Sequence, residues 1–198
     1  MDGDGYDDLL VGIPNQAVGG DAVEVAVLCP GDRDPHYLPA KPSLARKLSK
    51  ADALVYNGLE LEIGWLPLLI GKARNPDVKP GAPGEIDCST ALAEILEVPE
   101  GEIDRGMGDI HPHGNPHYTL DPRRMVRVAD LLAERFGRLD PEGAEAYRAG
   151  AAEFRSRVEA RLPDWEAAAV RAAERPVILY HRNWTYLADW LGLTVVGE

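Results

Sequence analysis

The sequence predicts an α/β fold in which covering helices pack on a mostly parallel sheet. Short apolar runs rich in Val and Ile alternate with stretches of helical periodicity, and this alternation is typical of parallel sheets. The composition agrees, because 45% hydrophobic and 27% charged residues are ordinary for a globular protein. A length of 198 residues allows one domain and part of a second.

The first part of the chain alternates between predicted strands and helices. Residues 21–28 alternate and are rich in Val, so we expect a strand there. Ser43 is placed to cap a helix over residues 44–50. A short buried strand is predicted over residues 53–57, and a helix over residues 65–73.

A long segment rich in Pro and Gly, residues 75–116, follows these elements. Loops of this length are usually functional or disordered. This one ends in a cluster of histidines. We therefore expect one long loop that forms part of a site.

The second part of the chain is predicted to be mainly helical. Pro122 opens a helix whose apolar stripe repeats every three to four residues. A longer helix is expected over residues 141–173, with Pro163 kinking or breaking it. A strand over 177–181, a helix over 184–191 and a final strand over 193–196 complete the elements.

Charge and apolar patterning exclude some classes of function. A net charge of -12 argues against nucleic-acid binding, since phosphate recognition needs a basic face. No apolar run is long enough to cross a bilayer and no signal peptide is evident. Cys29 and Cys88 could form one disulfide or remain free thiols.

The first residues resemble a calcium loop of integrin-type β-propellers, in which carboxylates alternate around a glycine turn. The matching positions are Asp2, Asp4 and Asp8. Calcium needs about six oxygen ligands, and a frayed acidic start is the alternative.

Three histidines far apart in the sequence are candidate metal ligands. His36 and His117 each follow a proline, and His181 ends the apolar run before it. Proline restricts the preceding backbone and lowers the cost of ordering a ligand. Neutral imidazole is a preferred zinc ligand, so these three side chains predict a zinc site. His111 and His113 are candidates for an accessory metal position.

Three stretches carry a resemblance to a known family: DPHYLPAKPS, GDIHPHGNPHYTLDP and VILYHRNWTYLADWLGL. Together they resemble zinc- and manganese-type solute-binding proteins (cluster A-I) of bacterial ABC importers. The resemblance implies two αβ lobes joined by a long helix, with metal in the cleft between them. It also implies a periplasmic protein that delivers metal to a membrane permease. The three histidines point to Zn²⁺ rather than Mn²⁺, since manganese favours more carboxylate.

The resemblance divides the chain into four parts. Residues 1–18 form an atypical acidic segment and residues 19–140 an N-terminal metal-binding lobe. Residues 141–175 form the connecting helix, and residues 176–198 begin a second lobe. The family's fourth ligand, a carboxylate, is expected beyond Glu198.

A shortened second lobe would leave apolar side chains uncovered, which a homodimer, or docking of this fragment on the first lobe, could cover. The side chains concerned are Leu179, Trp184, Leu187, Trp190 and Leu191.

Two other functions stay open at this point. A truncated scaffold could fold without holding metal tightly. An open site of three histidines is also typical of zinc hydrolases, whose bound water needs a nearby base. Glu60, Glu62 and Asp109 are available, but no spacing singles them out.

Overall fold

The structure, a computed structural model, describes residues 13–101, 111–173 and 175–197. The Asp-rich start with Asp2, Asp4 and Asp8 lies outside the described residues. The α-helices and strands occur in the order α1 Ile13–Gly19, α2 Pro42–Leu48, β1 Leu54–Tyr56, α3 Leu66–Ala73, β2 Glu85–Asp87, α4 Pro122–Leu139, α5 Ala144–Ala173, β3 Val177–Ile178, α6 Thr185–Leu191 and β4 Val195–Gly197. The α/β class is confirmed, because both two-stranded sheets are parallel.

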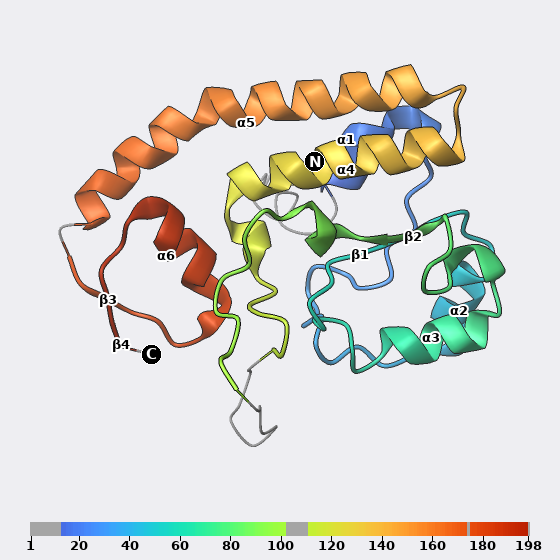
Figure 1. Cartoon of the computed structure of the whole chain (residues 1–198), viewed down its shortest axis with the longest axis horizontal. Helices are drawn as coiled ribbons and strands as arrows, with labels where there is room; N and C mark the ends of the chain where they lie inside the picture. The colour runs from blue at the N-terminus through green and yellow to red at the C-terminus, as the bar shows by residue number, and fades with distance from the viewer. Residues whose placement is uncertain (1–12, 102–110, 174, 198) are drawn as a thin grey trace.

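The first sheet lies between two groups of helices (Figure 1). β1 pairs with β2, with Val55 opposite Ile86, and α1, α4 and α5 lie on one side. α2 and α3 lie on the other side. The predicted strand over 53–57 and helix over 65–73 are therefore confirmed, since β1 and α3 occupy those positions.

The helical side of the sheet holds the larger hydrophobic core. Asp121 caps α4 by accepting a hydrogen bond from the Arg123 main-chain N–H, as a residue just before Pro122 should. The predicted stripe of α4 is buried and packs against α5 and α1. Its members are Met125, Val128, Ala129, Leu132 and Phe136. The guanidinium of Arg135 ties α4 to the sheet by donating to the carbonyls of Pro83 and Glu85.

Three details of the predicted elements are wrong. Residues 21–28 hold no strand, because no described strand pairs with them, and Val27 is 51% exposed. Ser43 lies inside α2, which begins at Pro42 with Lys41 as its N-cap. The segment 75–116 is not one loop, since β2 lies within it.

Pro163 does not break α5. The helix is assigned continuously through it and curves along its length (Figure 1). Removal of one main-chain donor bends a long helix without ending it when the flanking turns stay bonded.

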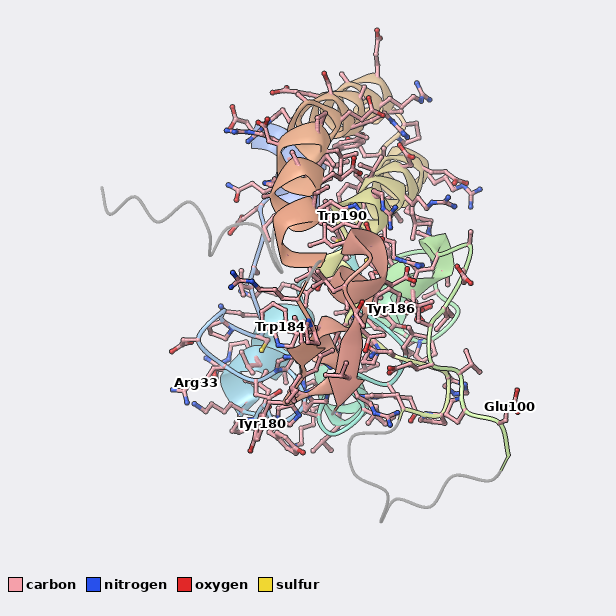
Figure 2. All side chains as sticks on the ribbon, turned by 90° about the vertical axis from the view of Figure 1, so that its left-hand side faces the viewer. Arg33, Glu100, Tyr180, Trp184, Tyr186 and Trp190 are labelled. Atoms are coloured by element: carbon pink, nitrogen blue, oxygen red, sulfur yellow. The ribbon has the colours of Figure 1, made fainter. Side chains whose placement is uncertain are left out.

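α6 and the β3–β4 pair form a smaller unit beyond the far end of α5 (Figure 1). Tyr186 is fully buried here, whereas Ile178 and Tyr180 are 77% and 92% exposed. Figure 2 looks onto this side and labels Tyr180, Trp184 and Tyr186. Trp184 is exposed and Leu179, Leu187, Trp190 and Leu191 are half-buried, so the expected partial exposure of this unit is confirmed.

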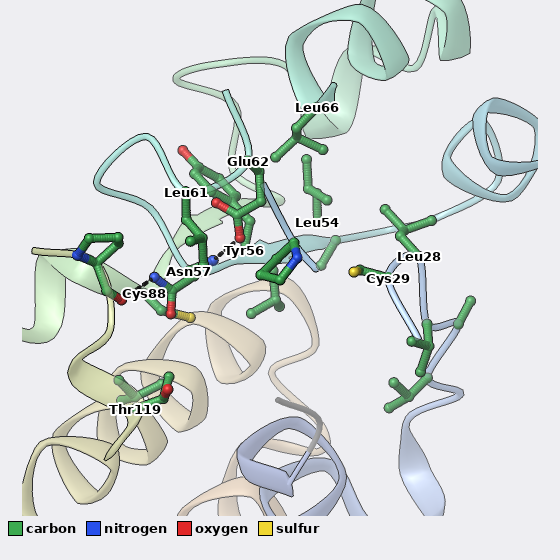
Figure 3. A pocket seen from close by; sticks show the side chains of 18 of the residues that line it. Leu28, Cys29, Leu54, Tyr56, Asn57, Leu61, Glu62, Leu66, Cys88 and Thr119 are labelled. Atoms are coloured by element: carbon green, nitrogen blue, oxygen red, sulfur yellow. Dashed lines mark hydrogen bonds between the residues drawn. The ribbon is translucent and has the colours of Figure 1, made fainter. Parts of the chain in front are cut away.

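The two cysteines are free thiols. Cys88 is buried under the sheet and Cys29 is half-buried across the pocket drawn in Figure 3. Burial is the main cause that raises the pKa of both thiols, and nearby carboxylates add to it. Thiolate is the reactive form, so both are slow nucleophiles.

We expect a thiol reagent such as Ellman's to modify Cys29 slowly in the native protein and to leave Cys88 untouched. Both should react once urea unfolds the chain. A Cys29→Ser variant gives the control, because it should show no reactive thiol until unfolding. Loss of free thiols in the untreated protein would indicate a disulfide instead.

Candidate metal centre

Two turns of the same design present His36 and His117. In Asp34-Pro35-His36 the Asp34 carboxylate accepts a hydrogen bond from the His36 main-chain N–H at 2.9 Å. In Asn115-Pro116-His117 the Asn115 side-chain oxygen accepts from the His117 main-chain N–H at 2.8 Å. Such turns fix the backbone through the side chain two residues earlier. Each histidine is thus held by a local, rigid loop.

Further hydrogen bonds anchor both turns to the first lobe. The Trp65 indole donates to the Pro35 carbonyl at 2.6 Å. The Asn57 side chain donates to the Pro116 carbonyl at 2.8 Å, one of the bonds drawn in Figure 3. Asn57 directly follows β1 and Trp65 is the N-cap of α3. Both histidines therefore lie at the end of the sheet where β1 stops.

His111 joins these two side chains. One ring nitrogen from each of His36, His111 and His117 lies within 4.8 Å of the others, and all three are half-buried. The Nε2 atoms of His36 and His111 are 3.3 Å apart. Two ligands about 2.05 Å from one tetrahedral zinc ion are about 3.3–3.4 Å apart. The spacing therefore fits two imidazoles on one ion.

Gly114 makes the approach of His111 possible. Its φ of +99° lies in the left-handed region, and its N–H donates to the His111 carbonyl at 3.1 Å. A Cβ there would come within 2.4 Å of the Ile95 side chain. The chain thus folds back between His111 and His117, so that two histidines six positions apart face the same space. A glycine midway between two histidines is the sequence signal for this turn.

The remaining predicted histidines lie apart from this group. His181 lines the same cavity of about 2100 Å³ as the three grouped histidines. Among the described residues, however, the group of ligating atoms does not include it. His113 is exposed, and its Nε2 lies 3.7 Å from a Glu60 carboxylate oxygen.

Glu62, one of the carboxylates that could serve as the base of a zinc hydrolase, has a structural role. Glu62 is buried, and its oxygens accept from the main-chain N–H groups of Asn57 and Gly58 at 2.8 and 3.3 Å. Burial raises the pKa of Glu62, and these hydrogen bonds offset the effect in part. Glu62 therefore stabilises the turn after β1. Asp109 lies outside the described residues.

Asp34 also contacts the imidazole of His36. Its Oδ1 lies 2.7 Å from the ring Nδ1. Its partial burial raises the pKa of the Asp34 carboxyl. The hydrogen bonds from His36, with the charges of His36 and His117, outweigh that effect and hold the pKa below its usual value. A carboxylate on the far ring nitrogen orients a ligating histidine and increases its basicity.

Asp34→Asn should weaken zinc binding by about tenfold, because the amide keeps the acceptor but loses the negative charge. Calorimetric titration measures the change. Asp32→Asn is the matched control, since Asp32 is exposed and its charge contact is with Arg33 at 3.8 Å. Equal losses in the two variants would mean that general surface charge, and not the bond to His36, is responsible.

The family model described as "Zinc-uptake complex component A periplasmic" matches residues 11–198. The chain belongs to this family. Members of this zinc-uptake family are solute-binding proteins and not enzymes, which excludes the hydrolase alternative. They work with the permease and ATPase components of ABC transporters.

Two curated relatives have sequences 25–26% identical to this chain. The "Zinc-binding lipoprotein AdcA" of Streptococcus pneumoniae serotype 4 is 26% identical over 186 residues, which is 91% of this chain and 35% of the relative. The "Manganese-binding lipoprotein MntA" of Halalkalibacterium halodurans is 25% identical, covering 91% of this chain and 54% of the relative. The chain thus spans about a third to a half of these relatives.

Solved structures show the same fold. A zinc-bound deletion mutant of ZnuA superposes with a TM-score of 0.72 at 30% identity, over 93% of this chain and 64% of the other. The Mn²⁺ complex of FpvC from Pseudomonas aeruginosa gives a TM-score of 0.70 at 23% identity, over 93% and 63%. The architecture is therefore common to proteins solved with zinc and with manganese.

Proposed function

We propose that this chain binds Zn²⁺ as cargo at the histidine group and delivers it, as part of a solute-binding protein, to the permease of an ABC importer. The observation that carries the proposal is the convergence of His36, His111 and His117 from distant segments, with two Nε2 atoms 3.3 Å apart. Three imidazoles favour zinc over manganese, which takes more oxygen ligands. The zinc-binding relative AdcA supports the same choice.

Two ligand sets follow from the sequence and the geometry. His36 and His117 are common to both, and the third ligand is His111 or His181. His181 lines the same cavity, and it would join the set only if it moved toward the other two on binding. Calorimetric zinc titration of His111→Ala and His181→Ala decides between them, because loss of the ligand should cost about 100-fold or more and loss of the other histidine much less.

The proposed metal preference is tested by competition. Zinc should displace Mn²⁺ at equal concentration, because imidazole nitrogen binds zinc more strongly. Retention of Mn²⁺ against zinc would contradict the assignment. Absence of binding by either ion would leave the scaffold alternative.

Zinc binding should also weaken with acid. Imidazole binds metal only when neutral, so protons compete with the ion. We expect release to set in as the pH falls toward about 6. Affinity that stays unchanged between about pH 7.5 and 5.5 would rule out histidine ligands.

Location and assembly are proposed from the family. The family description includes "periplasmic" and the two relatives are lipoproteins, so we propose that the chain works outside the cytoplasm. No helix among the described residues is long and apolar enough to span a membrane. The four-part division of the chain and the homodimer remain predictions, and sedimentation velocity tests the homodimer.

A further inference from the structure

One buried amide connects the turn of His117 to the segment that carries His181. The Asn115 side chain is only 4% exposed. Its oxygen accepts from the His117 main-chain N–H at 2.8 Å. Its nitrogen donates to the Arg182 carbonyl at 2.7 Å and to a Glu97 carboxylate oxygen at 2.9 Å. Asn115 thus contacts His117 itself and the residue next to His181.

A second set of hydrogen bonds supports the same junction. The Tyr186 hydroxyl donates to the Asn115 carbonyl at 2.9 Å and accepts from the Leu96 main-chain N–H at 3.0 Å. The Thr185 hydroxyl lies 2.8 Å from the Arg182 carbonyl oxygen and 3.0 Å from the other Glu97 oxygen. Tyr186 is fully buried in the same place. The segment before α6 is therefore held to the first lobe by directed hydrogen bonds around Asn115.

The chemistry of the junction requires a neutral amide. One side-chain atom must accept from an N–H while the other donates to a carbonyl and a carboxylate, and only Asn or Gln offers both. Aspartate has nearly the same shape but cannot donate. It would place a second carboxylate against Glu97 and remove both hydrogen bonds that the amide nitrogen donates. Asp34, at the equivalent place in the other turn, bonds the ring of its own histidine instead.

We propose that Asn115 is a positioning residue that holds the segment around His181 in fixed register with His117. The inference rests on the proposed function, because it takes the fixed position of the His181 segment relative to His117 to serve zinc binding. Asn115 does not touch the ion itself. Instead, Asn115 sets how close His181 comes to the group of His36, His111 and His117.

The first test needs no metal. Hydrogen exchange measured by mass spectrometry should be about tenfold faster in a peptide covering residues 179–187 of Asn115→Asp than in the unaltered protein. Asn75→Asp is the matched control. Asn75 is also buried, donates to two carbonyls, of Leu48 and Ala51, and accepts from the Asp77 N–H. Unchanged exchange in Asn115→Asp, or equally fast exchange in Asn75→Asp, overturns the positioning role.

The second test is a double-mutant cycle with zinc. Asn115→Asp should weaken binding about 10–100-fold in the unaltered background, but less than about threefold when His181 is already alanine. Asn75→Asp should leave affinity within about threefold in both. The visible spectrum of the Co²⁺-loaded Asn115→Asp protein should match that of His181→Ala.

Failure of the Asn115 proposal and failure of the proposed zinc function would give different results. Equal loss from Asn115→Asp with and without His181 overturns the link between this register and the ion, even if exchange changes as expected. Absence of zinc binding by the unaltered protein overturns the proposed function and the use of the register for zinc. In that case the exchange result still decides whether Asn115 holds the segment.

Discussion

Replacing either His36 or His117 with alanine should weaken zinc binding by about 100-fold or more. Loss of a residue that only supports a ligand costs about 10–100-fold, and loss of the ligand itself costs at least as much. Both residues belong to the group whose nitrogens lie within 4.8 Å of one another, and both ligand sets contain them. Calorimetry with a competing chelator covers the required range.

His113→Ala is the control for this prediction. His113 has 67% of its side chain exposed and faces Glu60, so its removal should change zinc affinity by less than about threefold. Far-ultraviolet circular dichroism should confirm that all three variants are folded. A loss in His113→Ala as large as in His36→Ala would show that the exposed histidine is a ligand and would contradict the proposed site.

Leu132→Ala should lower the free energy of unfolding by about 2–5 kcal/mol. Leu132 lies in the middle of α4 and has no exposed surface. It packs in the cluster shared by α1, α4 and α5, so its removal leaves a cavity that the rigid helices cannot close. The shift of the urea midpoint measures the loss.

Leu68→Ala makes the same chemical change on α3, where the side chain is 53% exposed. Its effect should stay within about 0.5–1 kcal/mol, since little apolar surface leaves water there on folding. A comparable loss in both variants would contradict the tight packing of Leu132, because helix propensity favours alanine at both positions.

Helices of the fold could be predicted better than strands. The stripe of α4 repeats for several turns and carries its own cap, so local sequence specifies it. Residues 21–28 have the composition of a strand, yet a strand exists only when a neighbour pairs with it. β2 was missed for the opposite reason, because its three residues directly follow the Pro- and Gly-rich residues 80–84 and take their structure from β1.

Some features of the candidate site could likewise be predicted from the sequence, and others could not. The local backbone that presents His36 and His117 follows from their Asx-Pro-His turns, which are visible in the sequence. Their convergence depends on long-range bonds from Trp65 and Asn57. The place of His111 depends on the left-handed conformation of Gly114, and that of His181 on contacts with Asn115 across the chain. The glycine between the two histidines is a local signal for the first relation, whereas the second leaves no pattern that a single sequence shows.

The packing of α4 against α5 has a consequence for how the protein acquires its structure. These helices are neighbours in the chain, so their contacts close short loops and should form early. The histidine group instead needs residues 36, 111 and 117 to meet, which requires long-range closure. We therefore expect a helical intermediate without a metal site, so that a native-like helical spectrum precedes zinc competence during refolding.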